Sequence, residues 1–134
     1  MLYSEKKISL MLDEATATLS LAYNLVKKEK VKQVVPAVQN ELVALRDIIS
    51  ASASSFDPIR VNALVTENVK ADSPKHPTKL TLNLGSAALD LACAKVRHAI
   101  VKAGSLNPWG IVTVAMDNLN KLADVLNALA RDEE

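Results

Sequence analysis

Residues 108–131 read PWGIVTVAMDNLNKLADVLNALAR, and their apolar positions recur in alternating steps of three and four residues. These positions are Val112, Ala115, Leu119, Leu122, Leu126 and Leu129. The opposite face is polar and carries Asp117, Asn120, Lys121, Asp124, Asn127 and Arg131. Such spacing is typical of an α-helix that packs one apolar seam against another helix. We expect this helix to open at Asn107-Pro108, with the asparagine as its cap.

The composition of the whole chain favours the same class of structure. Of 134 residues 49% are hydrophobic, yet only 3% are aromatic and three are glycine, so alanine, leucine and valine supply the apolar content. Strong helix formers and few glycines argue against a turn-rich β protein, and the apolar content argues against disorder. We therefore predict one all-α domain over residues 1–134, a bundle of four long helices and one shorter helix.

Three further helices are indicated by their apolar stripes and their end signals. The first is expected from just after Ser4 to about Lys28, the second from Pro36 to an end within residues 50–55, and the third from Pro58 to about Lys70. Ser4 is the expected N-cap of the first, and Asp57 caps the third just before Pro58. Pro36 is expected in the first turn of the second helix, where its missing N–H is not needed. The alternative is that residues 31–35 add a further turn, kinked before this proline.

The start of the segment 78–103 leaves a choice between helix and strand. Leu80, Leu82 and Leu84 alternate with polar residues as in a short strand, but no second strand is evident to pair with it. We expect a helix from Thr78 to Ala103, with Gly104 at its C-cap. Because this helix has little polar surface, it is also expected to be the central one.

Two of these helices carry more apolar surface than a small bundle readily buries. The first has a second apolar line on a different side, formed by Tyr3, Leu10, Ala17 and Leu21. Exposed patches of this kind usually mark protein contacts, so we expect an oligomer. The expected interface residues are Trp109, Val112, Leu119, Leu126, Leu10 and Leu21. Trp109 is interpreted either as a core residue or as an interface anchor, a role in which tryptophan is over-represented.

No residue pattern indicates catalysis. Cys93 and His98 are the natural nucleophile and base, but five residues along one helix they point about 140° apart. The three glycines form neither a phosphate-binding loop nor a dinucleotide fingerprint. We therefore expect no enzyme and no cofactor.

A metal site is not expected either. The sequence lacks the Cys-x-x-Cys and His-x-x-x-His spacings typical of zinc sites. A hard-cation site built from scattered carboxylates stays open, but Asp117, Lys121 and Asp124 are better interpreted as ordinary ion pairing along one helix face.

Two basic clusters could contact phosphates. They are Lys27, Lys28, Lys30 and Lys32 at the end of the first helix, and Lys70, Lys75, His76 and Lys79 around a proline-bearing loop. The alternative is that these side chains only solvate the surface and match helix dipoles. The net charge of +1 gives no global attraction to nucleic acid, and isolated aromatic residues offer no platform for base stacking. Any nucleic-acid contact is therefore expected at the backbone, without reading of sequence.

The sequence also indicates in which cellular compartment the protein is expected. Charged residues such as Glu5, Lys6 and Lys7 interrupt the N-terminus, so no classical secretory signal is expected. The longest uncharged run, residues 103–116, is too short for a membrane span. A single cysteine fits a reducing compartment. We expect a cytoplasmic protein, or one within a virion or another assembly.

These observations favour a non-enzymatic, self-assembling structural subunit, such as a small viral coat or filament protein. A regulatory adaptor or inhibitor that docks a helix face on a protein partner is the first alternative. A helical module that encloses a small ligand is the second.

Overall fold

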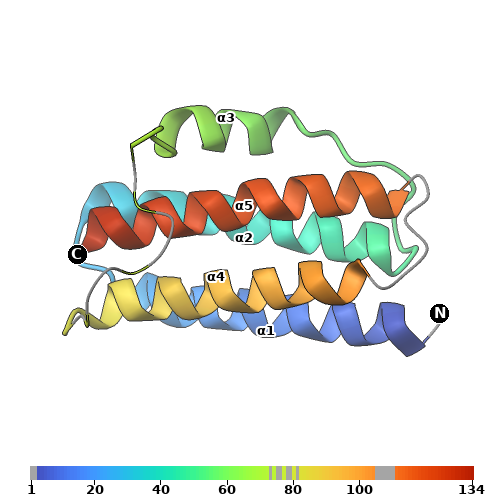
Figure 1. Cartoon of the computed structure of the whole chain (residues 1–134), viewed down its shortest axis with the longest axis horizontal. Helices are drawn as coiled ribbons and strands as arrows, with labels where there is room; N and C mark the ends of the chain where they lie inside the picture. Colours follow the sequence, from blue (N-terminus) through green and yellow to red (C-terminus); the bar gives the residue numbers. More distant parts are fainter. Residues whose placement is uncertain (1–2, 73, 75–76, 78–79, 81, 105–110) are drawn as a thin grey trace.

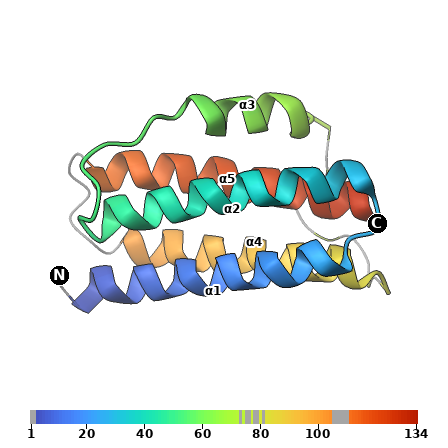
Figure 2. The same ribbon diagram turned by 180° about the vertical axis from the view of Figure 1, so that it is seen from behind.

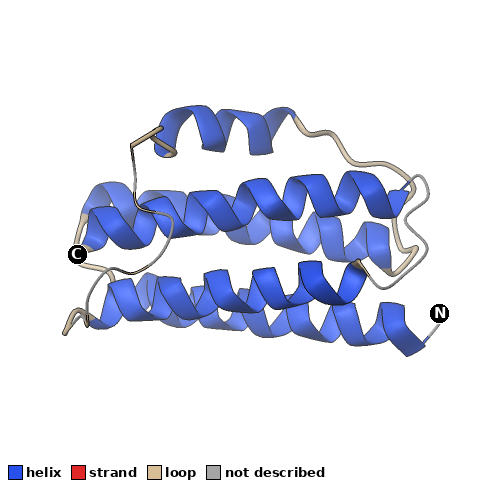
Figure 3. Cartoon of the chain, in the orientation of Figure 1, coloured by secondary structure: helices blue, strands red, loops and turns tan. Residues whose placement is uncertain are grey.

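The computed structural model describes residues 3–72, 74, 77, 80, 82–104 and 111–134. These residues form the helices α1 (Tyr3–Leu25), α2 (Glu29–Ile49), α3 (Ile59–Asn68), α4 (Leu84–Ala103) and α5 (Ile111–Glu133). Figure 3 shows helices and loops, and none of the described residues lies in a strand. The prediction of an all-α fold is confirmed.

The helices are arranged in two layers with α3 on the outside. In Figure 1, α1 and α4 form one layer, α2 and α5 form the next, and α3 lies over the outer side of the second layer. The reverse view in Figure 2 gives the same order. In Figure 1, α1 runs antiparallel to α2 and α4, and α5 also runs antiparallel to both. Helix α5 contacts α2, α3 and α4, whereas among the helices α4 contacts α1 and α5. Among the described residues, one layer is therefore covered on its outer side by α3, and no described helix covers the other.

The core lies between the layers and follows the predicted apolar stripes. In α1 the side chains of Ile8, Leu12 and Leu19 are fully buried, and in α2 those of Val38 and Leu42 are fully buried. Their spacing of three, four or seven residues places them on one side of each helix.

The most enclosed helix is α5, so the expectation that the helix ending at Ala103 would be central is wrong. Between Leu122 and Ala130 only Asp124 of α5 is exposed. By contrast, α4 exposes Leu84, Leu91 and Val101. The reason is the position of α3, which covers a second side of α5. The apolar periodicity of α5 alone does not predict that this side is buried.

The second helix begins seven residues earlier than expected, at Glu29 rather than Pro36. Pro36 lies inside α2, where it cannot donate to the carbonyl oxygen of Lys32. The apolar stripe nevertheless continues upstream of it, because Val31 and Val35 are buried at 2% and 1% exposure. Burial of these two valines compensates for the missing hydrogen bond, and residues 31–35 form a further turn of the helix upstream of Pro36.

The first helix ends at Leu25 instead of Lys28, and the residues that follow form the connection to α2. The backbone N–H groups of Lys27 and Lys28 donate to the two carboxylate oxygens of Glu133, over 2.9 and 3.1 Å. The side chain of Glu133 therefore holds the two residues that precede α2 and puts a negative charge near the positive end of the helix dipole. At the other end of α1, Ser4 lies inside the helix rather than capping it.

The fourth helix begins at Leu84, so neither the expected helix from Thr78 nor the alternative strand is found at residues 80, 82 and 83. The side chain of Asn83 caps the helix by accepting from the N–H of Ser86 over 2.9 Å. Leu80 and Leu82 lie before this cap and are more than 90% exposed.

The expected ends of the third and fourth helices are closer to what is found. Gly104 occupies the C-cap of α4 as predicted. At α3 the carboxylate of Asp57 accepts from the N–H of Ile59, but the N-cap is Pro58 rather than Asp57, so the helix begins one residue later than predicted. The helix itself runs from Ile59 to Asn68 and stops two residues short of Lys70. The segment Asn107-Pro108 lies outside the described residues.

Candidate interaction surface

The expected interface residues fall into three groups. Leu119 and Leu126 are fully buried, packed among the other helices of the same chain. Leu10 and Leu21 are on the surface, with 55% and 54% of their area exposed. Trp109 and the side chain of Val112 lie outside the described part of the chain. The apolar seam of α5 thus packs inside the bundle. Of the expected interface residues that the structure describes, only Leu10 and Leu21 on α1 are accessible to a partner.

The uncovered side of the α1–α4 layer carries the largest group of exposed apolar side chains in the described helices. We name it the open face; its main members are Leu10, Ala17, Leu21, Leu84, Leu91 and Val101. In Figures 1 and 2 this layer lies on the far side of the bundle from α3. Exposed apolar side chains gathered on one side of a soluble protein often mark an interaction site.

Two contacts fix how α1 and α4 lie against each other. Lys95 Nζ of α4 lies 3.0 Å from Glu14 Oε2 of α1. Near the other end of α4, a Cβ at Gly85 would lie only 2.8 Å from the Cα of Val26. With the helices antiparallel, residue 21 is therefore level with about residue 89. Leu21 and Leu91 are offset by about 3 Å along the helix axes, so they belong to the same part of the open face.

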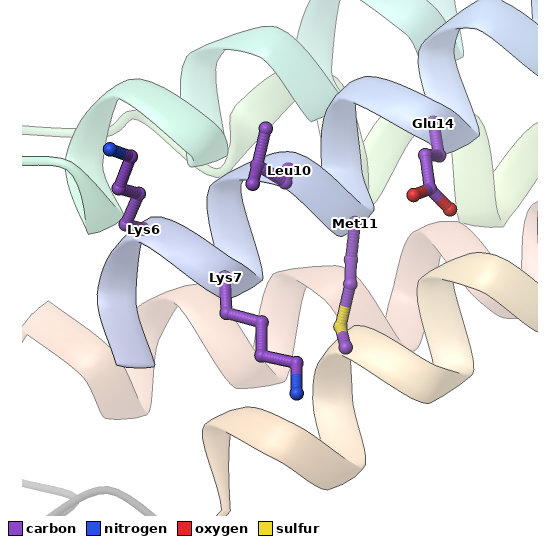
Figure 4. Close-up of a pocket in the computed structure, with 5 residues that line it drawn as sticks. All are labelled: Lys6, Lys7, Leu10, Met11 and Glu14. Carbon is purple, nitrogen blue, oxygen red and sulfur yellow. The ribbon is translucent and has the colours of Figure 1, made fainter. Parts of the chain in front are cut away.

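One end of the open face is hollowed. A cavity of about 390 Å³ is lined by Lys6, Lys7, Leu10, Met11 and Glu14 of α1. In Figure 4 the side chains of Lys7 and Met11 extend from α1 on the same side of the helix, and Lys6 extends on the other. Met11 packs against the core, whereas Leu10 stays exposed at the surface. The hollow combines apolar walls with charges of both signs, which suits a protein side chain better than a purely polar ligand.

The first basic cluster is partly engaged within the chain. The ammonium group of Lys28 donates to the carbonyl oxygen of Asp132. Lys32 Nζ lies 4.8 Å from the centre of the Tyr23 ring, within range of a cation–π interaction. Lys27 and Lys30 are exposed.

In the second basic cluster Lys70 is exposed, whereas Lys75, His76 and Lys79 lie outside the described residues. The described part of the two clusters therefore offers three exposed ammonium groups, those of Lys27, Lys30 and Lys70.

The thiol considered as a nucleophile is in the core. Cys93 is buried, and its sulfur donates to the carbonyl oxygen of Ala123 over 3.3 Å. Burial raises the pKa of Cys93, with Arg97 opposing the shift, so the reactive thiolate is disfavoured. His98 is exposed on the same helix. Among the described residues, no group of three or more histidine, cysteine, aspartate or glutamate side chains is placed to hold a metal ion.

The sequence interpretation missed two buried acidic residues, Glu133 in α5 and Glu41 in α2. The side chain of Glu41 is 8% exposed and faces α3. Glu41 follows Asn40 and precedes Leu42 in a regular helix pattern, and its burial depends on where α3 lies. A charged residue next to the apolar stripe of α2 is the only signal that the sequence carries for it.

None of the helices within the described residues combines the length and hydropathy needed to cross a membrane. Comparison of the chain with protein families, with curated proteins and with solved structures gives no match. The open face and the buried Glu41 are therefore interpreted from their own contacts.

Proposed function

We propose that this chain is a non-enzymatic structural subunit that assembles with copies of itself through the open face. The observation that supports the proposal is that α3 covers the outer side of one layer, whereas the outer side of the other layer keeps exposed apolar side chains. The chain covers the outside of α2 and α5 with α3, burying Val61 and Leu64, but leaves Leu21 and Leu91 about half exposed on α1 and α4. A second copy supplies for the open face what α3 supplies for the opposite side.

The charges on the open face favour a like partner. Glu14 and Lys95 already pair across the two helices, so the middle of the face carries no net charge that would repel an identical surface. A two-fold interface of this kind places the same patch of each copy against the other. Further contacts at the hollow beside Leu10 would extend such pairs into a filament or coat, which is the form of assembly that we propose.

Contact with a nucleic-acid backbone is a secondary part of the proposal. Lys27, Lys30 and Lys70 are exposed and available for phosphate oxygens. With so few free cations, such contact follows from many copies side by side rather than from one chain. The 260/280 nm absorbance ratio of the assembled fraction, measured before and after nuclease treatment, tests this part separately.

Light scattering after size-exclusion chromatography tests self-assembly. The wild-type chain is expected to form dimers or larger species at tens of micromolar. Leu91→Glu puts a charge in the centre of the open face and is expected to weaken association at least about tenfold. The matched control is Ile59→Glu, at a side chain that is 68% exposed on α3, and it should leave the mass unchanged.

A wild-type chain that stays monomeric at several hundred micromolar would contradict self-assembly and favour the alternative, an adaptor whose open face binds a different protein. Equal loss of mass in both variants would show that the open face is not the site.

A further inference from the structure

The second feature of the surface lies on the opposite side of the molecule, between α2 and α3. A cavity of about 280 Å³ there is lined by Ala37, Asn40 and Glu41 of α2 and by Arg60, Ala63, Leu64 and Glu67 of α3. The alanines and Leu64 give it apolar walls, while Glu41 and Glu67 supply two carboxylates.

The carboxylate of Glu41 lies at this cavity, on a side chain that is otherwise buried. Its side chain is 8% exposed, and it makes no hydrogen bond with the described residues. Its charged neighbour is Arg60, whose Nη1 lies 3.9 Å away and whose own side chain is 81% exposed. That separation is beyond hydrogen-bond range, and an exposed arginine is held weakly by such a contact.

Burial without hydrogen bonds is costly for a carboxylate, and burial raises the pKa of Glu41, with Arg60 opposing the shift and Asp57 adding to it. Buried groups perturbed in this way gather at binding and catalytic sites. Counted with Glu67 and Arg60, the cavity carries a net charge of about −1 when all three groups are ionised.

We propose that the cavity between α2 and α3 binds an aliphatic ammonium group, with the carboxylate of Glu41 accepting its hydrogen bonds. An ammonium ion supplies the donors and the positive charge that Glu41 lacks. The carbon chain of such a ligand lies along Ala37, Ala63 and Leu64, and Glu67 adds attraction at the same cavity. The group can belong to a free small amine or to the lysine side chain of another protein molecule, since both present the same chemistry.

This inference does not depend on self-assembly, because the cavity and the open face lie on opposite layers. The test is a titration of the ¹⁵N-labelled full chain with n-butylammonium, followed by amide shifts in NMR spectra. We expect saturable shifts confined to α2 and α3 around Asn40 and Ala63, with a millimolar dissociation constant, and no saturable shifts with n-butanol. Nα-acetyl-lysine amide distinguishes the sources: tighter binding than the free amine indicates a lysine side chain, and weaker binding a small amine.

Three variants make the result specific. Glu41→Gln is expected to weaken binding at least about tenfold, whereas Glu14→Gln, an equally conservative change on the open face, should leave it unchanged. Arg60→Ala is expected to tighten binding, because it removes the competing cation. Shifts spread over all acidic surfaces, or equal affinity in Glu41→Gln, would overturn the proposal; weaker binding in Arg60→Ala would also overturn it, since Arg60 would then be part of the ligand site.

Discussion

The two outer faces of this bundle are built from similar helices but are completed differently. On the α2–α5 side the short helix α3 buries Val61 and Leu64 against the layer. On the α1–α4 side no described helix covers the layer (Figures 1 and 2), and Leu21 and Leu91 are about half exposed. The difference shows that apolar residues at helical spacing lie either in the core of the same chain or on its surface, and we propose that the exposed ones contact another molecule.

The largest expected effect is a difference in the free energy of unfolding between substitutions in the core and substitutions on the open face. Leu126→Ala removes a fully buried side chain from α5 and should lower the free energy of unfolding by about 2–5 kcal/mol. Leu91→Ala, at a side chain that is 49% exposed, should change it by no more than about 0.5 kcal/mol in the monomer.

Urea unfolding at low micromolar concentration, followed by circular dichroism, measures both variants. Similar losses in the two would mean that Leu91 is packed within the chain and that the open face is not open.

A smaller effect tests how tightly the open layer itself is joined. Gly85→Ala would place a Cβ 2.8 Å from the Cα of Val26 and 3.0 Å from the carbonyl oxygen of Leu25, both backbone atoms that cannot swing aside. Although alanine favours a helix, the close approach of α1 and α4 here should make the change destabilising by about 1–3 kcal/mol.

Gly104→Ala is the matched control, because its Cβ would meet nothing nearer than 3.4 Å and its φ is −63°. Thermal unfolding should show this variant unchanged or slightly stabilised. A Gly85→Ala variant as stable as Gly104→Ala would refute the close α1–α4 contact and the register derived from it.

Helix existence and the core stripes were open to prediction from the sequence, because burial of residues such as Leu12, Leu19 and Leu42 follows directly from their spacing. The sequence could not predict whether the apolar seam of α5 packs within the chain or against another molecule, because the same spacing is found in both cases. Just before α2, the backbone N–H groups of Lys27 and Lys28 donate to Glu133, which is more than a hundred residues away in the sequence. The local sequence around residue 28 cannot predict such a long-range contact. Glu41 is hidden for the same reason, because α3 buries it from outside α2.

The smallest effect concerns the covered side and depends on pH. Because burial raises the pKa of Glu41, the folded chain holds this proton to higher pH than the unfolded chain does. The cost of ionised Glu41 is therefore absent below the unfolded pKa and grows as pH rises through the folded pKa. Glu41→Gln should raise the free energy of unfolding at pH 7 by at most about 1 kcal/mol, and this gain should vanish near about pH 4.

Urea midpoints for both proteins between these pH values measure this effect, and Glu14→Gln serves as the exposed control. A gain for Glu41→Gln that is larger in acid than at neutral pH would contradict the assigned direction.

The central claim, that the α1–α4 face is completed by a second copy, is tested most directly by isotope-filtered NMR on an equimolar mixture of labelled and unlabelled chains. Intermolecular contacts are expected from the methyl groups of Leu21 and Leu91, with none from Ile59 on α3. Intermolecular contacts from Ile59 alone, or none at a concentration where light scattering reports a dimer or larger species, would contradict the account.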